Sequence, residues 1–242
     1  MNLNFDSYFA IYKTPTNDCF DARFPLSTTL IDAKKLTLKS LELPVNFNNI
    51  RDSGSLNVFS IFTNLGNTYN VTIPSFNHST ITTLLTALNT AFVGVVPSTT
   101  FTFSVSGNYV NLSATSSTIT SFIINNTVLS NAVLGFKTTG SPLSITAITP
   151  YLLNVDNYII MYINNVQALH IENTGNFRQS FKIPLNAVNG IIYYEAENNS
   201  FPQSVYLSPN NNIQYLDITI YDRFGQKILC NNSDYSFTLS VE

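Results

Sequence analysis

Short runs of alternating apolar and polar residues recur along the chain, and turn-forming residues separate them at intervals of about ten residues. The most regular runs are 216–221 and 235–241, and the second reaches the last residue of the sequence. A period of two gives a strand one buried and one polar face. The pattern therefore predicts an antiparallel sandwich or barrel, with the end of the chain paired into a sheet.

Further strands are expected wherever an apolar run lies between turn signals. In 36–43 the apolar phase shifts, which predicts a bulge or bend at Lys39 and Ser40, and Pro44 ends or edges that strand. Residues 158–163 are apolar throughout, as in a strand buried on both faces or covered by another subunit. Asn164 and Asn165 are expected to turn the chain back into 166–171. The remaining expected strands are 57–63, 69–73, 121–125, 177–183, 190–194 and 205–207.

A tight hairpin is predicted over residues 101–114. A two-residue turn at Gly107 and Asn108 would place every apolar side chain of both strands on one face. The register that this turn implies pairs Val105 with Val110, Phe103 with Leu112, and Phe101 with Ala114.

One helix is predicted. Apolar residues recur at three- and four-residue spacing over 81–92. Asn77 or Ser79 can cap its start, and Gly94 with Pro97 ends it. A single helix among many strands suits a mainly β protein in which the helix covers one sheet face.

The chain is unusually poor in charge. Only 10% of its residues are charged, against about 25% in ordinary soluble domains. Asn, Ser and Thr supply the polarity, and neutral side chains cost less to desolvate than ions when neighbouring subunits cover them. This composition suggests extensive assembly, unless the abundance of Asn simply reflects nucleotide bias in the source genome.

Composition also argues against several classes of function. The net charge is −3 and no Lys/Arg run occurs, so nothing predicts binding to nucleic acid. The N-terminus lacks a secretion signal and no stretch is long and apolar enough for a membrane span, which predicts a cytosolic protein. Cys19 and Cys230 are expected to be free thiols, although they would be neighbours if the chain ends meet.

Candidate catalytic groups are scarce. The only histidines, His78 and His170, lack a metal-binding spacing, and no Gly-rich phosphate loop occurs. Glu195 and Glu197 would share one strand face and suit a glycosidase or a Ca²⁺ site, but a solvated strand edge explains them better. We therefore expect no catalysis, cofactor, metal or small-molecule substrate.

The segment from Asp222 to Gly225, DRFG, is predicted to be a turn. Gly225 would take a positive φ and Asp222 would bind the local backbone. Because charge is rare, Asp222 and Arg223 are also candidates for pairing across a subunit boundary, together with Arg51 and Arg178.

Three segments resemble one protein family. The segment LTLKSLELPVNFNNI, residues 36–50, looks like the opening strand and bend of penton and minor capsid proteins of virophages, polinton-like viruses and nucleocytoplasmic large DNA viruses. Residues 69–74, the Leu-rich helix and 134–136 are similar to a recurrent segment of the same group. The ending LDITIYDRFG with DYSFTL, residues 216–225 and 234–239, is similar as well.

The resemblance implies an antiparallel jelly-roll β-sandwich, made of residues 1–64 and 143–242, with a small α+β lobe at 65–142. It implies a capsid protein of the virion, assembled in the host cytoplasm as a homopentamer at fivefold vertices, beside a double jelly-roll major capsid protein. It carries over no catalytic residue. The short length and the lack of a basic N-terminal arm leave open a minor capsid or spike-associated protein. The sequence also leaves open a viral fibre, a receptor- or carbohydrate-binding sandwich, and a hydrolase using Glu195 or Glu197.

Overall fold

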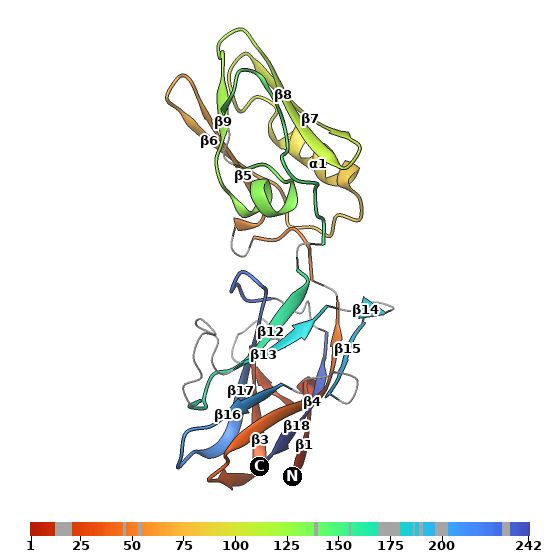
Figure 1. Ribbon diagram of the computed structural model, residues 1–242, viewed down its shortest axis with the longest axis vertical. Coiled ribbons are helices and arrows are strands. Elements are labelled where there is room, and N and C mark those ends of the chain that lie inside the picture. The colour runs from red at the N-terminus through yellow and green to blue at the C-terminus, as the bar shows by residue number, and fades with distance from the viewer. Residues whose placement is uncertain are drawn as a thin grey trace. The chain divides into compact units, whose positions relative to one another are not determined.

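The structure is a computed structural model, and its chain forms two compact units. Residues 1–47 and 156–242 form the first unit, and residues 48–155 form the second (Figure 1). The structure describes residues 1–12, 21–45, 47–52, 55–137, 140–154, 156–168, 180–185, 187–188, 191–196, 203–228 and 233–242.

The first unit is a sandwich of two antiparallel sheets. One sheet has the order β1-β18-β4-β15-β14, and β16 pairs with another part of β4. The other has the order β13-β12-β17-β3-β2. The bounds of the first sheet are β1 Asn2–Asp6, β18 Ser236–Val241, β4 Lys35–Pro44, β15 Ile191–Glu195, β14 Ala187–Val188 and β16 Ser204–Tyr206. Those of the second are β13 Ser180–Pro184, β12 Tyr158–Ile163, β17 Asn212–Tyr221, β3 Asp21–Ile31 and β2 Ile11–Tyr12.

The strand order is that of a jelly roll. If β1, β3, β4, β12, β13, β15, β17 and β18 are numbered one to eight, the sheets read 1-8-3-6 and 2-7-4-5. This arrangement of two interlocked Greek keys is the double-sheet jelly roll. The second unit is inserted between the third and fourth strands, β4 and β12. The chain is therefore mainly β, with one α-helix in the described part.

The inner faces of the two sheets share one hydrophobic core. Alternate residues of β17 and β18 enter it, as their period of two predicts: Leu216, Ile218 and Ile220 from β17, and Phe237, Leu239 and Val241 from β18. Phe237 stacks on Phe5 with ring centroids 4.7 Å apart and meets Phe24 edge-on at 5.1 Å. The two ends of the chain thus close the same core, and Figure 1 shows both termini beside β1 and β18.

The predicted bulge in β4 is confirmed. Thr238 pairs with Ser40 while the next residue, Leu239, pairs with Leu38, so Lys39 is the extra residue. The bulge restores the apolar phase, and Leu36, Leu38, Leu41 and Leu43 all reach the core.

Several elements of the first unit differ from the predictions, including the short strands β2 and β14, which were not predicted. Strands β1 and β3 were not predicted; Pro25 lies inside β3 and its polar neighbours mask the alternation, yet β3 follows β17 along most of its length. The predicted return strand 166–171 is not formed at 166–168, and its last three residues lie outside the described part. The strands that flank β12 are instead β13 and β17.

The second unit contains two small antiparallel sheets and the helix. The four-stranded sheet has the order β10-β9-β5-β6, and the three-stranded sheet has the order β11-β8-β7. Phe59, Phe92, Phe103 and Phe136 cluster between them with ring contacts of 5.1 to 6.1 Å to Phe59. The bounds are β5 Val58–Thr63, β6 Thr68–Thr72, β9 Phe122–Ile124, β10 Gly140–Ser141, β7 Thr99–Ser106, β8 Tyr109–Ser116, β11 Ser144–Thr146 and α1 Ile81–Ala91.

Local predictions for the second unit are largely confirmed. The 101–114 hairpin has the expected register and turn, with Gly107 at φ +58°. The helix exists, but its N-cap is Thr80, whose hydroxyl accepts from the Thr83 amide, rather than Asn77 or Ser79. A π-helix at Leu129–Val133 was not predicted.

The unit boundaries lie further out than the expected 65 and 142. Strand β5 pairs with β6 and β9, and β11 pairs with β8, so the segments 48–64 and 143–154 belong with the inserted unit. Apolar alternation predicts a strand but does not say which strand lies beside it.

Candidate subunit interface

The Asp222–Gly225 segment is the predicted turn. The Asp222 carboxylate Oδ1 accepts the backbone N–H groups of Phe224 and Gln226, each at 2.8 Å. Gly225 has φ +78°, and its N–H donates to the Asp222 carbonyl at 3.1 Å. Asp222 is 0% exposed, so this carboxylate stabilises its own turn.

The other predicted interface residues are Arg51, Arg223 and Arg178. Arg51 belongs to the inserted unit, is 6% exposed, and its Nη1 donates to the Asn48 carbonyl at 3.1 Å. Arg223 places its guanidinium 4.8 Å from the centroid of the Phe224 ring. Arg178 lies outside the described residues. An intersubunit role for these four residues stays a prediction, and the burial of Arg51 and Asp222 leaves them little surface to offer.

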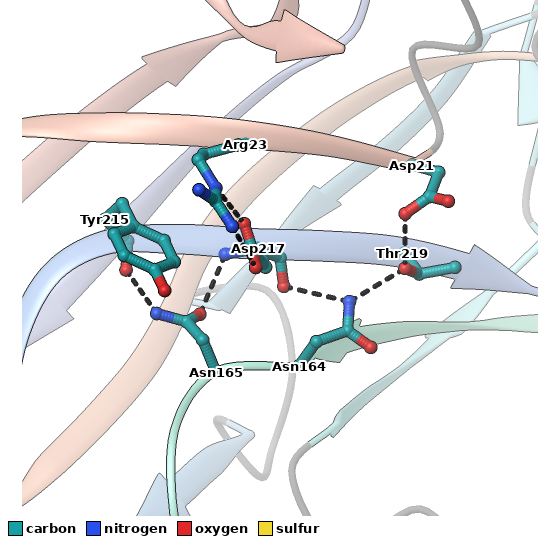
Figure 2. A network of polar contacts seen from close by, with 7 residues as sticks. All are labelled: Asp21, Arg23, Asn164, Asn165, Tyr215, Asp217 and Thr219. Carbon is teal, nitrogen blue, oxygen red and sulfur yellow. Dashed lines mark hydrogen bonds and ion pairs between the residues drawn. The ribbon is translucent and has the colours of Figure 1, made fainter. Parts of the chain in front are cut away.

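A polar network lies on β17 and its neighbours, on the side away from the core (Figure 2). Arg23 of β3 donates to both Asp217 carboxylate oxygens, at 2.8 and 3.1 Å, which raises the pKa of the guanidinium. Its guanidinium also lies 4.0 Å from the Tyr215 ring centroid. Thr219 donates to Asp21 at 2.9 Å, and Lys227 pairs with the same carboxylate. These bonds hold β3 against β17 at positions that alternation leaves facing outward.

The turn after β12 completes this network. The Asn165 side chain accepts the Asp217 amide at 2.8 Å and donates to the Tyr215 carbonyl at 2.6 Å. The Asn164 side chain donates to the Thr219 hydroxyl at 2.8 Å. Asn164 and Asn165 therefore bind the edge of β17 instead of leading into a hairpin. The network is a structural brace in which both of its buried carboxylates are paired.

The outer face of the first sheet is almost uncharged along β1 and β18. Of the six outward positions on β1 and β18, only Asp6 carries charge, whereas the neighbouring β4 presents Lys35, Lys39 and Glu42 outside the core. Thr238 donates to the Asn4 side chain at 2.9 Å, so neighbouring strands satisfy one another. Such a face can be buried at small desolvation cost. The six positions are Asn2, Asn4, Asp6, Ser236, Thr238 and Ser240.

An exposed aromatic projection lies at the β1 edge of the sandwich. After β1 the chain makes one 3₁₀ turn, Ser7–Phe9, in which Tyr8 is 70% and Phe9 is 75% exposed. Ile11 of β2 is 59% exposed. We call Tyr8, Phe9 and Ile11 the edge patch. Solvent-exposed aromatic groups of this size are typical of interface anchors.

The backbone beneath the edge patch is firmly held. Asp6 caps the turn by accepting the Tyr8 N–H at 2.9 Å. Ser7 is 0% exposed; its N–H donates to the Tyr235 carbonyl at 2.9 Å, and its hydroxyl accepts the Tyr235 N–H at 2.8 Å. The exposed rings therefore project from an anchored turn, which lowers the entropy lost when a partner covers them.

A pocket opens beside the patch. Its volume is about 450 Å³, and it lies where β1 faces β3. Phe5, Phe9, Phe24 and Pro25 supply an apolar lining, and Asp6 supplies the one charged group among the lining residues. The remaining lining residues are Asn4 and Ser236.

Comparison with solved structures gave likenesses of fold. No family model matches the chain, and no curated protein matches it. A crystal structure of the mavirus penton protein matches with a TM-score of 0.47 at 14% identity, covering 100% of this chain and 98% of that one. The function proposed below therefore rests on the fold and surface of this chain itself.

Of the histidines, glutamates and cysteines singled out in the sequence, His78 and Glu195 lie among the described residues. His78 lies in the inserted unit, 6% exposed, and burial lowers its pKa. Its Nδ1 is 3.4 Å from the Thr83 hydroxyl. Glu195 ends β15 on an exposed position, as expected for a solvated strand edge. His170, Glu197, Cys19 and Cys230 lie outside the described residues.

The edge patch and its pocket were missed in the sequence. Leu3 and Phe5 alternate with Asn2, Asn4 and Asp6, and this short run was a readable strand signal. The exposure of Tyr8 and Phe9 could not be predicted, because the sequence does not show which aromatic residues the core accommodates.

Within the described residues no helix is long and apolar enough to cross a membrane.

Proposed function

We propose that this chain is a structural protein of a viral capsid, a penton protein that assembles as a homopentamer at fivefold vertices beside a double jelly-roll major capsid protein. The observation that carries the proposal is the jelly roll with strand orders 1-8-3-6 and 2-7-4-5, together with the almost uncharged outward positions of β1 and β18. Jelly rolls of this kind build viral capsids and lectins.

The surface favours a shell component over a solitary protein. An uncharged face loses little hydration energy when another subunit covers it, and the edge patch supplies aromatic anchors. A closed ring of identical subunits uses two different surfaces of each copy and leaves neither exposed. The proposed location is the virion, with assembly in the host cytoplasm and with the major capsid protein as the second partner.

The buried carboxylates support a non-catalytic role. Of the four buried carboxylates among the described residues, Asp21 and Asp217 are ion-paired and Asp222 is bound to its own turn, so these three have structural tasks. Catalytic acids need reach to a substrate, and these groups are 5%, 7% and 0% exposed.

The mass in solution tests the proposal. Light scattering coupled to size-exclusion chromatography, over a concentration series, should show a species of about 135 kDa, five times the 26.9 kDa chain. A monomer at every concentration, including mixtures with the major capsid protein from the same source, would overturn the penton assignment. Saturable binding on a glycan array by that monomer would favour a carbohydrate-binding sandwich instead.

A further inference from the structure

The sandwich has two sides that differ in chemistry. One side, where β1, β2 and β3 end the sheets, carries the edge patch and the pocket of about 450 Å³. The opposite side ends in β15 and β14 of one sheet and in β13 of the other. In a head-to-tail ring, one such side of each copy meets the other side of the next copy.

The β13 side presents a cation on an aromatic ring. Lys182 of β13 is exposed, and its ammonium lies 4.1 Å from the centroid of the Tyr158 ring on β12. Both residues occupy outward positions, because Ile159 and Met161 of β12 and Phe181 and Ile183 of β13 enter the core. Within the described part of the chain, Lys182 makes no salt bridge with a carboxylate.

The pocket on the other side is complementary to this pair. Three of its seven lining residues are phenylalanines, and Asp6 is the one charged residue among them. Its volume lies within the range of roughly 300–1,000 Å³ of sites that hold small organic groups. Asp6 is exposed and its carboxylate accepts the Tyr8 N–H, which leaves further acceptor positions for an ammonium group. A tyrosine ring can pack against the phenylalanine rings of the pocket, and the lysine ammonium that lies over it can pair with the Asp6 carboxylate.

We propose that the pocket at the β1 edge receives Tyr158 and Lys182 of a second copy of this chain, with Lys182 of that copy paired to Asp6, and that this is the repeating contact of the ring. This inference rests on the proposed assembly and names its surfaces. The exposed rings of Tyr8 and Phe9 extend the contact beyond the pocket. The uncharged strands around them form its rim.

A charge-swap cycle tests the pairing. Asp6→Lys and Lys182→Asp should each weaken self-association about tenfold or more, because each places like charges together at a covered contact. The double variant restores opposite charges in reverse order and should associate about threefold or more tightly than Asp6→Lys alone, which equally lacks the Asp6 cap. Native mass spectrometry and light scattering over a concentration series measure all four proteins.

Matched controls separate the pairing from a general effect of charge. Glu42→Lys changes the net charge as Asp6→Lys does, on an exposed position of β4, and Lys39→Asp matches Lys182→Asp at the exposed bulge. Both controls should assemble as wild type does. Thermal unfolding of every variant at a concentration that keeps it monomeric checks that the fold is intact.

The outcomes separate the two proposals. If the wild type forms a ring and the swaps at Asp6 and Lys182 weaken it no more than the controls, this contact is wrong while the capsid assembly stands. If single swaps weaken the ring and the double variant stays weak, the two residues do not face each other and the pairing is wrong. A wild-type monomer at all concentrations overturns both the ring and this contact.

Discussion

Replacing Gly135 by alanine should strongly destabilise the inserted unit. Gly135 has φ +80°, a conformation that costs an L-residue about 1–2 kcal/mol. An added Cβ would also lie 2.0 Å from the Thr149 carbonyl oxygen, where ordinary contacts begin at 3.4 Å. That oxygen belongs to backbone, so the 147–149 segment must move. The movement disturbs the bonds that the Ile148 and Thr149 amides donate to the Gly135 carbonyl, at 3.0 and 3.2 Å.

The expected loss is about 4 kcal/mol of unfolding free energy, combining the φ cost, about 1 kcal/mol for each disturbed hydrogen bond, and the clash itself. Gly107→Ala is the matched control, since Gly107 has φ +58° with nothing within 4 Å of an added Cβ, and it should lose only about 1 kcal/mol. Urea unfolding by far-ultraviolet circular dichroism measures the loss, and hydrogen exchange with mass spectrometry locates it in residues 48–155.

Equal losses in Gly135→Ala and Gly107→Ala would refute the reasoning. That result would mean that the contact with Thr149 relaxes at no cost and that only the backbone conformation matters. A loss of protection in the jelly roll and not in the inserted unit would contradict the division into two compact units.

Three further predictions concern single side chains. Because burial lowers the pKa of His78, the stability it contributes should be complete above its unfolded pKa of about 6.5 and should decline as the pH falls below that value; urea midpoints at several pH values should show this decline, and His78→Gln should lessen it. The Tyr194 hydroxyl is buried without a hydrogen-bond partner among the described residues, so Tyr194→Phe should leave thermal stability unchanged or raise it by up to about 1 kcal/mol, and a clear loss would reveal a partner. Phe237→Ala removes a ring that packs on Phe5 and Phe24, and it should cost the jelly roll about 3–5 kcal/mol in urea unfolding; a loss under about 1 kcal/mol would show that the site collapses without strain.

The turn at Asp222 was predictable from sequence, whereas the burial of Arg51 was not. A carboxylate that binds backbone N–H groups two and four residues later depends only on local chain geometry, so the residue types reveal it. Arg51 is buried because of the packing around it, and the residues next to it in sequence contain no sign of that burial. The edge patch is the reverse case, since Tyr8 and Phe9 are large aromatic side chains and are nevertheless exposed.

The sequence by itself determined the local β structure: the 101–114 hairpin with its register, the Lys39 bulge, the helix at 81–91 and the alternating strands near the end of the chain. These follow from periodicity and turn chemistry, which act over a few residues. Only the tertiary structure decided that β3 lies beside β17, that Asp21 meets Lys227 across 206 positions, and that β5 belongs to the inserted unit. Strand partners and the burial of polar groups depend on contacts between distant segments, because each strand edge can hydrogen-bond to any other until the packing of side chains selects one.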